Sequence, residues 1–367
     1  MNSSETSILA VVFDLDGTLL DTERVTRGVL KEFLEKYGKE LDKEREDNKR
    51  VGLTQSESAA AIVRDYCLPL SPDEYMMEIM PMYRESWAHA KALPGANRLI
   101  KYLHKHGVPL ALASNSFREN IEAKISYQQG WKEYFSVILG SDQVKSEKPS
   151  PDIYTEAAKR MGVDVACCLV IEDCSVGVRA AKDAKMKVVA IPSRGEADCS
   201  TIADTILHSL LEFRPELWGL PQFQDWIDNA LPIEPIYISS VYRDGSISEV
   251  EEDDKSALPD QIVGVYFGWT KVDMHQVLKV VVSIGRNHCC RTAKRKMQMC
   301  LVDGKNLMAN LQLELVLVGY IQELNSKGPR ITDMEIFEEV KSIARRSLDL
   351  PLFIHHSSIL SAANMVK

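Results

Sequence analysis

Short apolar runs that stop at polar residues are the clearest pattern along the chain. Three such runs are followed by acidic or small polar side chains: residues 8–13 by Asp14 and Asp16, residues 110–113 by Ser114 and Asn115, and residues 169–171 by Glu172 and Asp173. Runs of this length predict strands buried on both faces of a parallel sheet. Ligands bind at the carboxyl ends of such strands, so we expect these polar side chains to surround one point. Four carboxylates, a hydroxyl and an amide suit a divalent metal ion and a phosphate group.

The segment after the first predicted strand has helical periodicity. Apolar residues recur at helical spacing in residues 24–37 and 57–65, and residues 72–90 form a further acidic, Met-rich helical stretch. No strand pattern interrupts these helices. The sequence therefore predicts a helical insert, over about residues 22–92, between the first strand and the rest of the sheet.

From Leu93 onward, predicted helices and strands alternate with short connections. The helices are expected at residues 94–105, 116–126, 150–162 and 175–184, and the strands at residues 108–113, 136–139, 169–171 and 188–191. This alternation predicts an α/β domain with a doubly wound parallel sheet, covering residues 1–217 with the helical insert included.

The second part of the chain has a different pattern. Residues 218–235 contain prolines and aromatic residues, and we interpret them as a linker. Three β-branched and aromatic runs follow with no helices between them, at residues 264–269, 277–284 and 311–321. They predict a small antiparallel β domain over residues 236–367, on which a last amphipathic helix at residues 332–346 packs.

The composition and net charge of the chain limit which kinds of molecule it is expected to bind. The chain has 367 residues, 45% of them hydrophobic, and a net charge of −9, which argues against a surface for nucleic acid. No apolar run reaches the roughly 18 residues needed to span a bilayer. The first residues lack the basic and apolar stretches of a secretory signal. We therefore expect a small-molecule partner, with no nucleic acid and no membrane, and the sequence does not indicate the oligomeric state.

The cysteines point to a reduced compartment. Eight cysteines occur without CxxC spacing, so we predict a cytoplasmic protein without a disulfide framework. Cys67, Cys168 and Cys174 lie in apolar surroundings and are predicted to be small buried side chains. A zinc site is not predicted, because the spacing of its candidate ligands matches no zinc pattern: His288, Cys289, Cys290 and Cys300.

The segment from Asp14 to Thr18 is the most specific chemical signal. Asp14 is expected at the end of a buried strand, and Asp16 points to the same side two residues later. Two carboxylates this close repel each other unless a cation lies between them or one is protonated, and both situations serve phosphoryl transfer. Gly17 lets the chain turn away, while Thr18 offers a hydroxyl and an N–H group to a phosphate.

Each motif alone has an ordinary structural explanation. A single Asp-x-Asp is commonly a loop, a Glu-Asp pair after a strand usually caps the next helix, and a Lys-Pro pair carries almost no information. Here they occur together and in order: Asp14 to Thr18, then Ser114 and Asn115, then Lys148 with Pro149, then Glu172 and Asp173. This combination resembles the haloacid dehalogenase superfamily of phosphatases, and the helical insert resembles its cap.

The resemblance implies a role for each of these residues. Asp14 would be the nucleophile that becomes an aspartyl-phosphate, and Asp16 the general acid and then the general base. Lys148 would neutralise the charge shared by Asp14 and the phosphate. The phosphate-binding residues would be Thr18, Ser114 and Asn115, and the Mg²⁺ site would use Asp14, the main-chain carbonyl of Asp16, Glu172 and Asp173.

Nearby polar residues leave two interpretations open. Thr54 and Glu57 in the insert could face the site and select the substrate, or simply begin a helix. Asp142 follows a strand and could orient Lys148.

The resemblance extends to the plant-type bifunctional riboflavin kinase/FMN phosphatase family. The similar segments span almost the whole chain: residues 93–100, 111–115, 121–131, 223–227, 264–269, 283–285 and 318–321. In that family the N-terminal half hydrolyses FMN, and the C-terminal half, a small β-barrel, transfers phosphate from ATP to riboflavin.

The C-terminal half departs from the family pattern at its catalytic motifs. The family's Gly-rich stretch ending in Pro-Thr-Ala-Asn has no counterpart in residues 238–262, where an acidic segment stands instead. The family's catalytic Glu should follow Ser283 to Gly285, but residues 286–303 contain no Glu. These losses would remove the groups that position ATP and activate the hydroxyl.

The sequence therefore favours a Mg²⁺-dependent FMN phosphatase that carries a catalytically degenerate, riboflavin kinase-like barrel. Three alternatives stay open: a phosphatase for another small ester such as a sugar or glycerol phosphate, a non-catalytic flavin-binding or scaffold protein, and an enzyme that is still bifunctional.

Overall fold

The protein is described here by a computed structural model. The described residues are 7–42, 53–192, 199–243, 246–249, 258–272, 276–285, 295–304, 310–322 and 334–362. Their contacts divide the chain into two compact units, Met1–Gln222 and Phe223–Lys367.

A six-stranded parallel sheet forms the centre of the first unit, in the order β3-β2-β1-β4-β5-β6. Its strands are β1 (Ala10–Phe13), β2 (Leu110–Ala113), β3 (Val137–Leu139), β4 (Cys168–Glu172), β5 (Lys187–Ala190) and β6 (Thr205–Ile206). The three central strands β2, β1 and β4 are buried along their whole length. The chain leaves β1 toward β2 on one side and reaches β4 on the other, which makes the end of β1 the topological switch point where ligands bind in such sheets.

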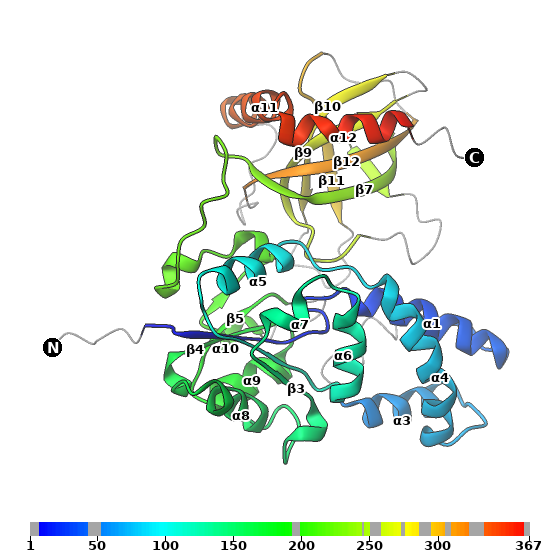
Figure 1. Ribbon diagram of the computed structural model, residues 1–367. Coiled ribbons are helices and arrows are strands. Elements are labelled where there is room, and N and C mark those ends of the chain that lie inside the picture. Colours follow the sequence, from blue (N-terminus) through cyan, green and yellow to red (C-terminus); the bar gives the residue numbers. More distant parts are fainter. Residues whose placement is uncertain are drawn as a thin grey trace. The chain divides into compact units, whose positions relative to one another are not determined.

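Helices cover both faces of this sheet (Figure 1). Ala10 and Val12 of β1 pack in the apolar cluster formed with α8 (Asp152–Met161) and α9 (Ser175–Asp183). The alternate residue Phe13 lies on the opposite face, where its ring meets Phe135 edge-on at 6.1 Å. The helices on that face are α5 (Ala96–Lys105) and the short α7 (Trp131–Tyr134), and two more helices of this unit are α6 (Arg118–Ser126) and α10 (Cys199–Ile202). The predicted doubly wound α/β fold is confirmed.

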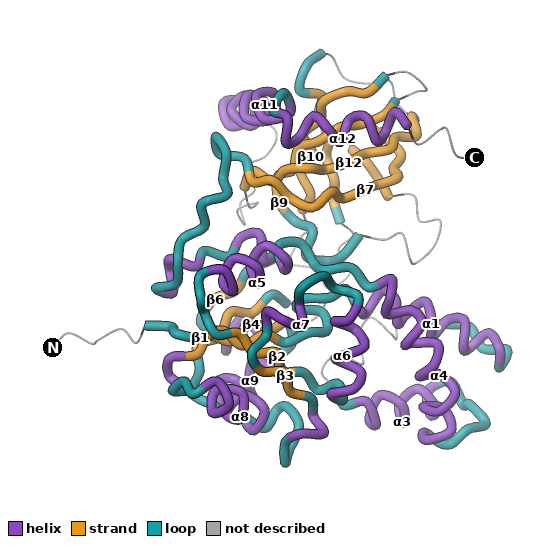
Figure 2. Tube along the Cα trace, viewed as in Figure 1, coloured by secondary structure: helices purple, strands orange, loops and turns teal. Residues whose placement is uncertain are grey.

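The insert after β1 is helical, as Figure 2 shows. It contains α1 (Thr22–Lys36), α3 (Gln55–Asp65) and α4 (Pro72–Ser86), followed by the 3₁₀ turn η1 (Trp87–His89). These helices share their own apolar cluster, whose fully buried members include Phe33, Tyr75 and Ile79. The insert therefore has a separate small core, as expected of a cap.

Thr54 and Glu57 prove to be a helix cap. The Thr54 hydroxyl accepts a hydrogen bond from the Glu57 N–H at 3.1 Å, and the Glu57 carboxylate accepts one from the Thr54 N–H at 3.0 Å. This reciprocal capping box begins α3. The side chains of Thr54 and Glu57 are therefore hydrogen-bonded to the main chain at the start of α3.

The two segments that join the cap to the core run side by side. The Asp21 N–H donates to the Lys91 carbonyl at 3.0 Å, and the Leu93 N–H donates to the Leu19 carbonyl at 2.8 Å. Leu20 and Ala92 form the bridge between these bonds. The cap is therefore joined to the core by two chain segments that are hydrogen-bonded to each other, and the first of them follows Asp14 and Asp16 closely in the sequence.

The second unit is a closed barrel of six strands in the order β10-β11-β8-β7-β12-β9. Its strands are β7 (Leu231–Arg243), β8 (Ser246–Glu249), β9 (Gly264–Lys271), β10 (Val277–Gly285), β11 (Lys296–Leu301) and β12 (Leu311–Gln322). The described pairings are antiparallel. The predicted antiparallel barrel is confirmed, although β7 begins at Leu231, inside the range that the sequence assigned to the linker.

Two glycines let the barrel strands approach each other closely. A Cβ atom on Gly268 of β9 would lie 1.9 Å from the Val316 carbonyl oxygen, and one on Gly319 of β12 would lie 1.9 Å from the Phe267 ring. Both glycines fall within the segments that resemble the family. Those segments are therefore required by packing, whatever the chemistry of the domain.

Two helices cover part of the barrel (Figure 1). The predicted last helix appears as α11 (Met334–Leu348), and a second helix, α12 (Pro351–Ala362), was not predicted. Ile343, Ala344 and Phe353 from these helices pack with Phe267 and Val316 of the barrel in one apolar cluster.

The cysteine predictions were right in part. Cys168 is buried, but Cys67 is exposed and Cys174 is half-buried, where its sulfur caps α9. Three of the four considered zinc ligands, residues 288–290, lie outside the described residues. No helix in the described ranges is both long enough and apolar enough to cross a membrane.

Asp204 fastens β5 to the segment before β6. Its carboxylate accepts hydrogen bonds from the Val188 N–H at 2.8 Å and from Lys182 Nζ at 2.9 Å, and Lys187 Nζ lies 3.4 Å away. Burial acts to raise the pKa of Asp204, but these donors and charges outweigh it and hold the pKa below its ordinary value.

We predict that Asp204→Asn lowers the free energy of unfolding by about 1 kcal/mol at pH 7, a value reduced for the partial exposure of the site. Because the folded state has the lower pKa, this stabilisation is complete above the pKa of the unfolded chain and is lost as pH falls through that of the folded one. Urea unfolding should therefore show a difference at pH 7 that narrows below about pH 4. Asp183→Asn, at an exposed position, is the control, and an Asp204→Asn effect independent of pH would contradict the assignment.

Candidate active site

Asp14 lies one residue beyond β1, where its carboxylate meets the ammonium group of Lys148. Lys148 Nζ donates to Asp14 Oδ1 at 2.8 Å and to the Ala113 carbonyl at 2.9 Å. Both side chains are almost fully buried. Burial raises the pKa of the Asp14 carboxyl to about 7, because the nearby Lys148 charge offsets only part of the lost hydration. The pair can present a carboxylate oxygen to a phosphoryl group beside a fixed positive charge.

Glu172 holds the other side of the same ammonium group. Lys148 Nζ donates to Glu172 Oε1 at 2.6 Å, and the Tyr154 hydroxyl donates to that oxygen at 2.6 Å. Glu172 Oε2 accepts from the Asp173 N–H at 3.0 Å. Burial acts to lower the pKa of Lys148, but Asp14 and Glu172 outweigh it and hold that pKa well above its usual range. Lys148 is therefore charged, and both Glu172 oxygens already accept hydrogen bonds.

Gly177 provides the space for the Glu172 carboxylate. It lies in the first turn of α9, where a Cβ atom would be 1.7 Å from Glu172 Oε1 and 2.0 Å from its Cδ. No side chain fits there unless Glu172 moves.

Asp16 interacts with a different cation. Lys124 Nζ, from α6, lies 2.7 Å from Asp16 Oδ1 and 2.8 Å from Oδ2. The Ser116 hydroxyl donates to Oδ2 at 3.0 Å, and the Ser114 hydroxyl lies 3.4 Å from it. Burial acts to raise the pKa of Asp16, but the Lys124 charge outweighs it and the pKa lies below its ordinary value. Asp16 is therefore ionised here, the form that can accept a proton from water.

The remaining predicted residues lie in the same place. The Thr18 hydroxyl is 3.4 Å from Asp173 Oδ1. Asn115 clamps the main chain of Lys148: its Oδ1 accepts from the Lys148 N–H at 3.0 Å, and its Nδ2 lies 3.4 Å from the Lys148 carbonyl. The phosphate contacts expected of Thr18, Ser114 and Asn115 stay predictions.

The site residues predicted from the sequence form one group, linked by hydrogen bonds, ion pairs and charge–charge interactions: Asp14, Asp16, Thr18, Ser114, Asn115, Lys148, Glu172 and Asp173. Asp142 does not orient Lys148. Its carboxylate instead accepts from the Arg118 N–H at 2.8 Å, at the start of α6.

Two residues that contact the site, Lys124 and Tyr154, were not predicted from the sequence. Lys124 occupies the apolar face of α6 with Ile121 and Ile125, and a lysine at helical spacing within a buried stripe is a usable signal. Tyr154 similarly lies beside Ile153 on the buried face of α8. Their partners, however, come from strands more than 15 residues away in sequence, and no local pattern reveals such contacts.

Four carboxylates gather at this edge of the sheet, those of Asp14, Asp16, Glu172 and Asp173. Lys148 contacts Asp14 and Glu172, and Lys124 contacts Asp16. The donors of Asp14, Asp173 and the Asp16 carbonyl are oxygens, which suit Mg²⁺.

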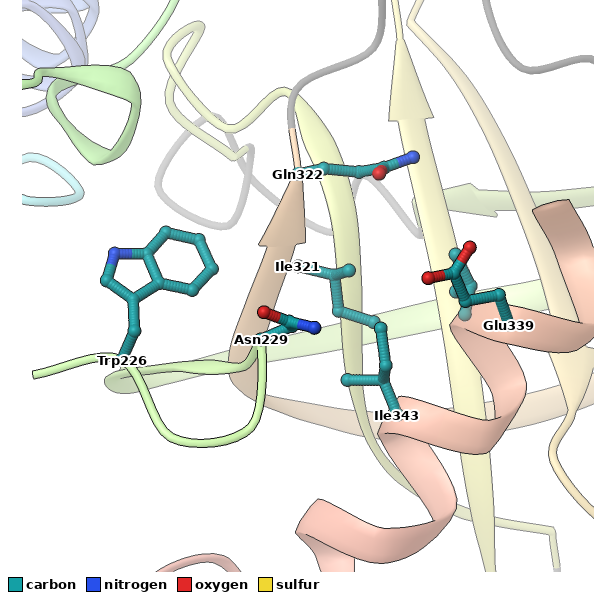
Figure 3. Close-up of a pocket in the computed structure, with 7 residues that line it drawn as sticks. Trp226, Asn229, Ile321, Gln322, Glu339 and Ile343 are labelled. Carbon is teal, nitrogen blue, oxygen red and sulfur yellow. The ribbon is translucent and has the colours of Figure 1, made fainter.

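The barrel unit has a pocket of its own, with a volume of about 270 Å³ (Figure 3). It is lined by Trp226, Asn229, Ile321, Gln322, Glu339, Val340 and Ile343. None of these described lining residues is a lysine or arginine.

Comparisons with known proteins agree with this architecture. Residues 8–185 match the family model for haloacid dehalogenase-like hydrolases, and residues 249–327 match that for riboflavin kinase. The bifunctional riboflavin kinase/FMN phosphatase of Arabidopsis thaliana is 44% identical over 366 residues, covering 96% of each chain. The chain belongs to the bifunctional riboflavin kinase/FMN phosphatase family. Its N-terminal half is a phosphatase of the haloacid dehalogenase type.

More distant similarities concern the phosphatase half of this family member. (DL)-glycerol-3-phosphatase 1 of Arabidopsis thaliana is 37% identical over 60% of this chain and 76% of its own length. A haloacid dehalogenase family hydrolase from Deinococcus radiodurans, solved with bound phosphate and sodium, is 27% identical with a TM-score of 0.50. It covers 59% of this chain and its own whole length.

We predict that Gly177→Ala lowers kcat by about 100-fold, because the added methyl group displaces Glu172 and thereby Lys148. Steady-state phosphate release measures the loss, and thermal unfolding checks the fold. Arg179→Ala, on the exposed side of the same helix, is the matched control. Unchanged kcat in a folded Gly177→Ala protein would show that the Glu172 position does not matter.

Proposed function

We propose that the N-terminal unit hydrolyses FMN to riboflavin and inorganic phosphate. The observation that carries this proposal is the buried Asp14–Lys148 pair at the switch point of the sheet, beside Thr18 and Asp173. The full-length Arabidopsis relative, whose name includes FMN phosphatase, supports FMN as the ester. The proposed partner is thus a small phosphate ester.

The reaction would proceed in two steps. An Asp14 carboxylate oxygen attacks phosphorus, the bond from phosphorus to the ester oxygen breaks, and the proton of the Asp16 carboxyl passes to the leaving riboflavin oxygen. Lys148 balances the charge shared by Asp14 and the phosphoryl oxygens. Water then attacks the aspartyl-phosphate, its proton passes to the Asp16 carboxylate, and phosphate leaves with Asp14 restored. The ionised Asp16 described above corresponds to the form that acts in the second step.

We propose Mg²⁺ as the cofactor of this site. Asp14, Asp173 and the main-chain carbonyl of Asp16 would hold it, and Glu172 is a further candidate. When bound, it would supply positive charge to the transferring phosphoryl group. The oxygen donors gathered at this edge of the sheet support this assignment.

A glycerol phosphate is the second candidate substrate. The similarity to (DL)-glycerol-3-phosphatase 1 covers most of the phosphatase half, so the same catalytic core could serve a smaller ester. We propose that the cap decides between them.

We also propose that the barrel has lost kinase activity. The chain lacks a Pro-Thr-Ala-Asn stretch in residues 238–262 and a Glu in residues 286–303, parts of which lie outside the described residues. The family match over residues 249–327 is compatible with this loss, because packing alone requires Gly268 and Gly319.

A cytoplasmic location is proposed from the cysteine content. Imaging of a C-terminally tagged chain in cells tests it, and a signal confined to an organelle would contradict it.

We predict that the purified chain with Mg²⁺ releases phosphate from FMN, and that EDTA abolishes the release. A panel with FMN, glycerol 3-phosphate and sugar phosphates decides the substrate. Asp14→Asn should lose at least ~10³-fold in kcat, because a carboxamide cannot act as the nucleophile. Background release from FMN alongside turnover of glycerol 3-phosphate would reject FMN, and full activity of Asp14→Asn would reject the mechanism.

We predict no FMN formation when the chain is incubated with riboflavin and Mg-ATP. Because the phosphatase would remove any product, the assay uses the Asp14→Asn chain and follows FMN by chromatography. Sustained turnover would show that the kinase is intact and that its catalytic groups lie elsewhere in the barrel.

A further inference from the structure

Lys124 is a buried cation that none of the roles assigned above explains. It lies on the apolar face of α6 with only 6% of its surface exposed, between Ile121 and Ile125. An ammonium group at such a position is costly unless it is paired and hydrogen-bonded. Its partners therefore indicate what it is for.

Its described polar contacts converge on Asp16. Nζ lies 2.7 Å and 2.8 Å from the two Asp16 oxygens and 3.0 Å from the Ser116 hydroxyl, which itself donates to Asp16 at 3.0 Å. Lys148, by contrast, contacts Asp14. The two aspartates of the site are thus held by two different lysines.

Lys124 also contacts the cap. Its Nζ lies 5.0 Å from the centre of the Trp87 ring, within the range of a cation–π interaction. Trp87 belongs to η1, the last turn of the cap before the chain returns to the core, and only 3% of it is exposed.

Further contacts hold the same surface of α6 against the cap. Trp87 and Ala90 form an apolar cluster against which Ala123 of α6 packs. Arg84 of α4 pairs with Glu119 of α6 at 2.7 Å, and Gln128 donates to the Ala90 carbonyl at 3.0 Å. Lys124 therefore lies between Asp16, the proposed acid and base, and the surface of α6 that packs on the cap.

We propose that Lys124 positions the Asp16 carboxylate, and that Trp87 of the cap in turn fixes Lys124. Lys124 is a positioning residue, since it acts through Asp16. The inference rests on the proposed role of Asp16 as acid and base. It links the placement of the cap to the placement of the group that transfers the proton.

A double-mutant cycle tests the link to Asp16. Lys124→Met should lower kcat/KM for FMN by about 10- to 100-fold, because the Asp16 carboxyl group would no longer be held in place for proton transfer to the leaving oxygen. In an Asp16→Asn background the same substitution should change kcat/KM by less than about 2-fold, since the group on which it acts is gone. Equal losses in the two backgrounds, or no loss with Asp16 present, would overturn the proposal.

The leaving group gives a second readout. p-Nitrophenyl phosphate expels a stable phenolate that needs little protonation, so Lys124→Met should cost it less than about 5-fold. An equal loss for both esters would indicate general damage to the fold. Lys101→Met, at an exposed position of α5, is the matched control. Lys124→Gln replaces Lys124→Met if thermal unfolding shows that the latter is not folded.

Trp87→Leu tests the link to the cap. It should lower kcat/KM for FMN several-fold with Asp16 present and have no further effect in the Asp16→Asn background. Additive losses would show that Trp87 acts independently of Asp16.

The wild-type panel separates this proposal from the proposed function. If FMN is inert and glycerol 3-phosphate is hydrolysed, FMN is rejected and the same cycle is run with glycerol 3-phosphate. If no ester is hydrolysed, the function and the inference fail together. An active wild type with additive variants rejects the Lys124 role alone.

Discussion

The burial of the Lys148 ammonium group is the constraint on which the site depends. A charge removed from water is tolerated only when opposite charges and hydrogen bonds replace the lost hydration, and Asp14 and Glu172 supply them at 2.8 Å and 2.6 Å. The surroundings follow from this requirement. Gly177 leaves room for the Glu172 carboxylate, and Tyr154 donates to it. Without Lys148, two buried carboxylates would face each other with no compensating charge.

A second lysine lets the two aspartates differ although they are two residues apart. The Asp14 carboxyl contacts Lys148 and is almost fully buried, and this burial raises its pKa to about 7. Asp16 meets Lys124 and two serine hydroxyls at the edge of the site, where the Lys124 charge outweighs burial and lowers its pKa. The proposed roles of Asp14 as nucleophile and of Asp16 as acid and base call for different surroundings, because one would attack phosphorus while the other would exchange a proton with water. The two cations come from different parts of the fold: Lys148 lies in the loop before α8, and Lys124 lies in α6.

The parts that the sequence could predict are those encoded locally. Short apolar runs form β1, β2 and most of β4, and the polar residues that follow these runs lie together because parallel strands share one edge. Lys124 and Tyr154 could not be placed, since their roles depend on contacts across distant segments. In the barrel, β7 was missed because Pro232 and Pro235 interrupt its pattern, and prolines normally argue against a strand.

The two halves of the chain show that fold and chemistry are specified by different residues. In the barrel, the family-like segments contain Gly268 and Gly319, where even a methyl group would collide with the neighbouring strand or ring. These positions keep six strands closed and would be needed by a barrel without catalytic activity. In the phosphatase half, the buried charges of Asp14, Lys148 and Glu172 weaken rather than build an apolar core, and the proposed chemistry gives them a role. A family match therefore shows the architecture of both halves, whereas the charged residues carry the proposed mechanism of the first.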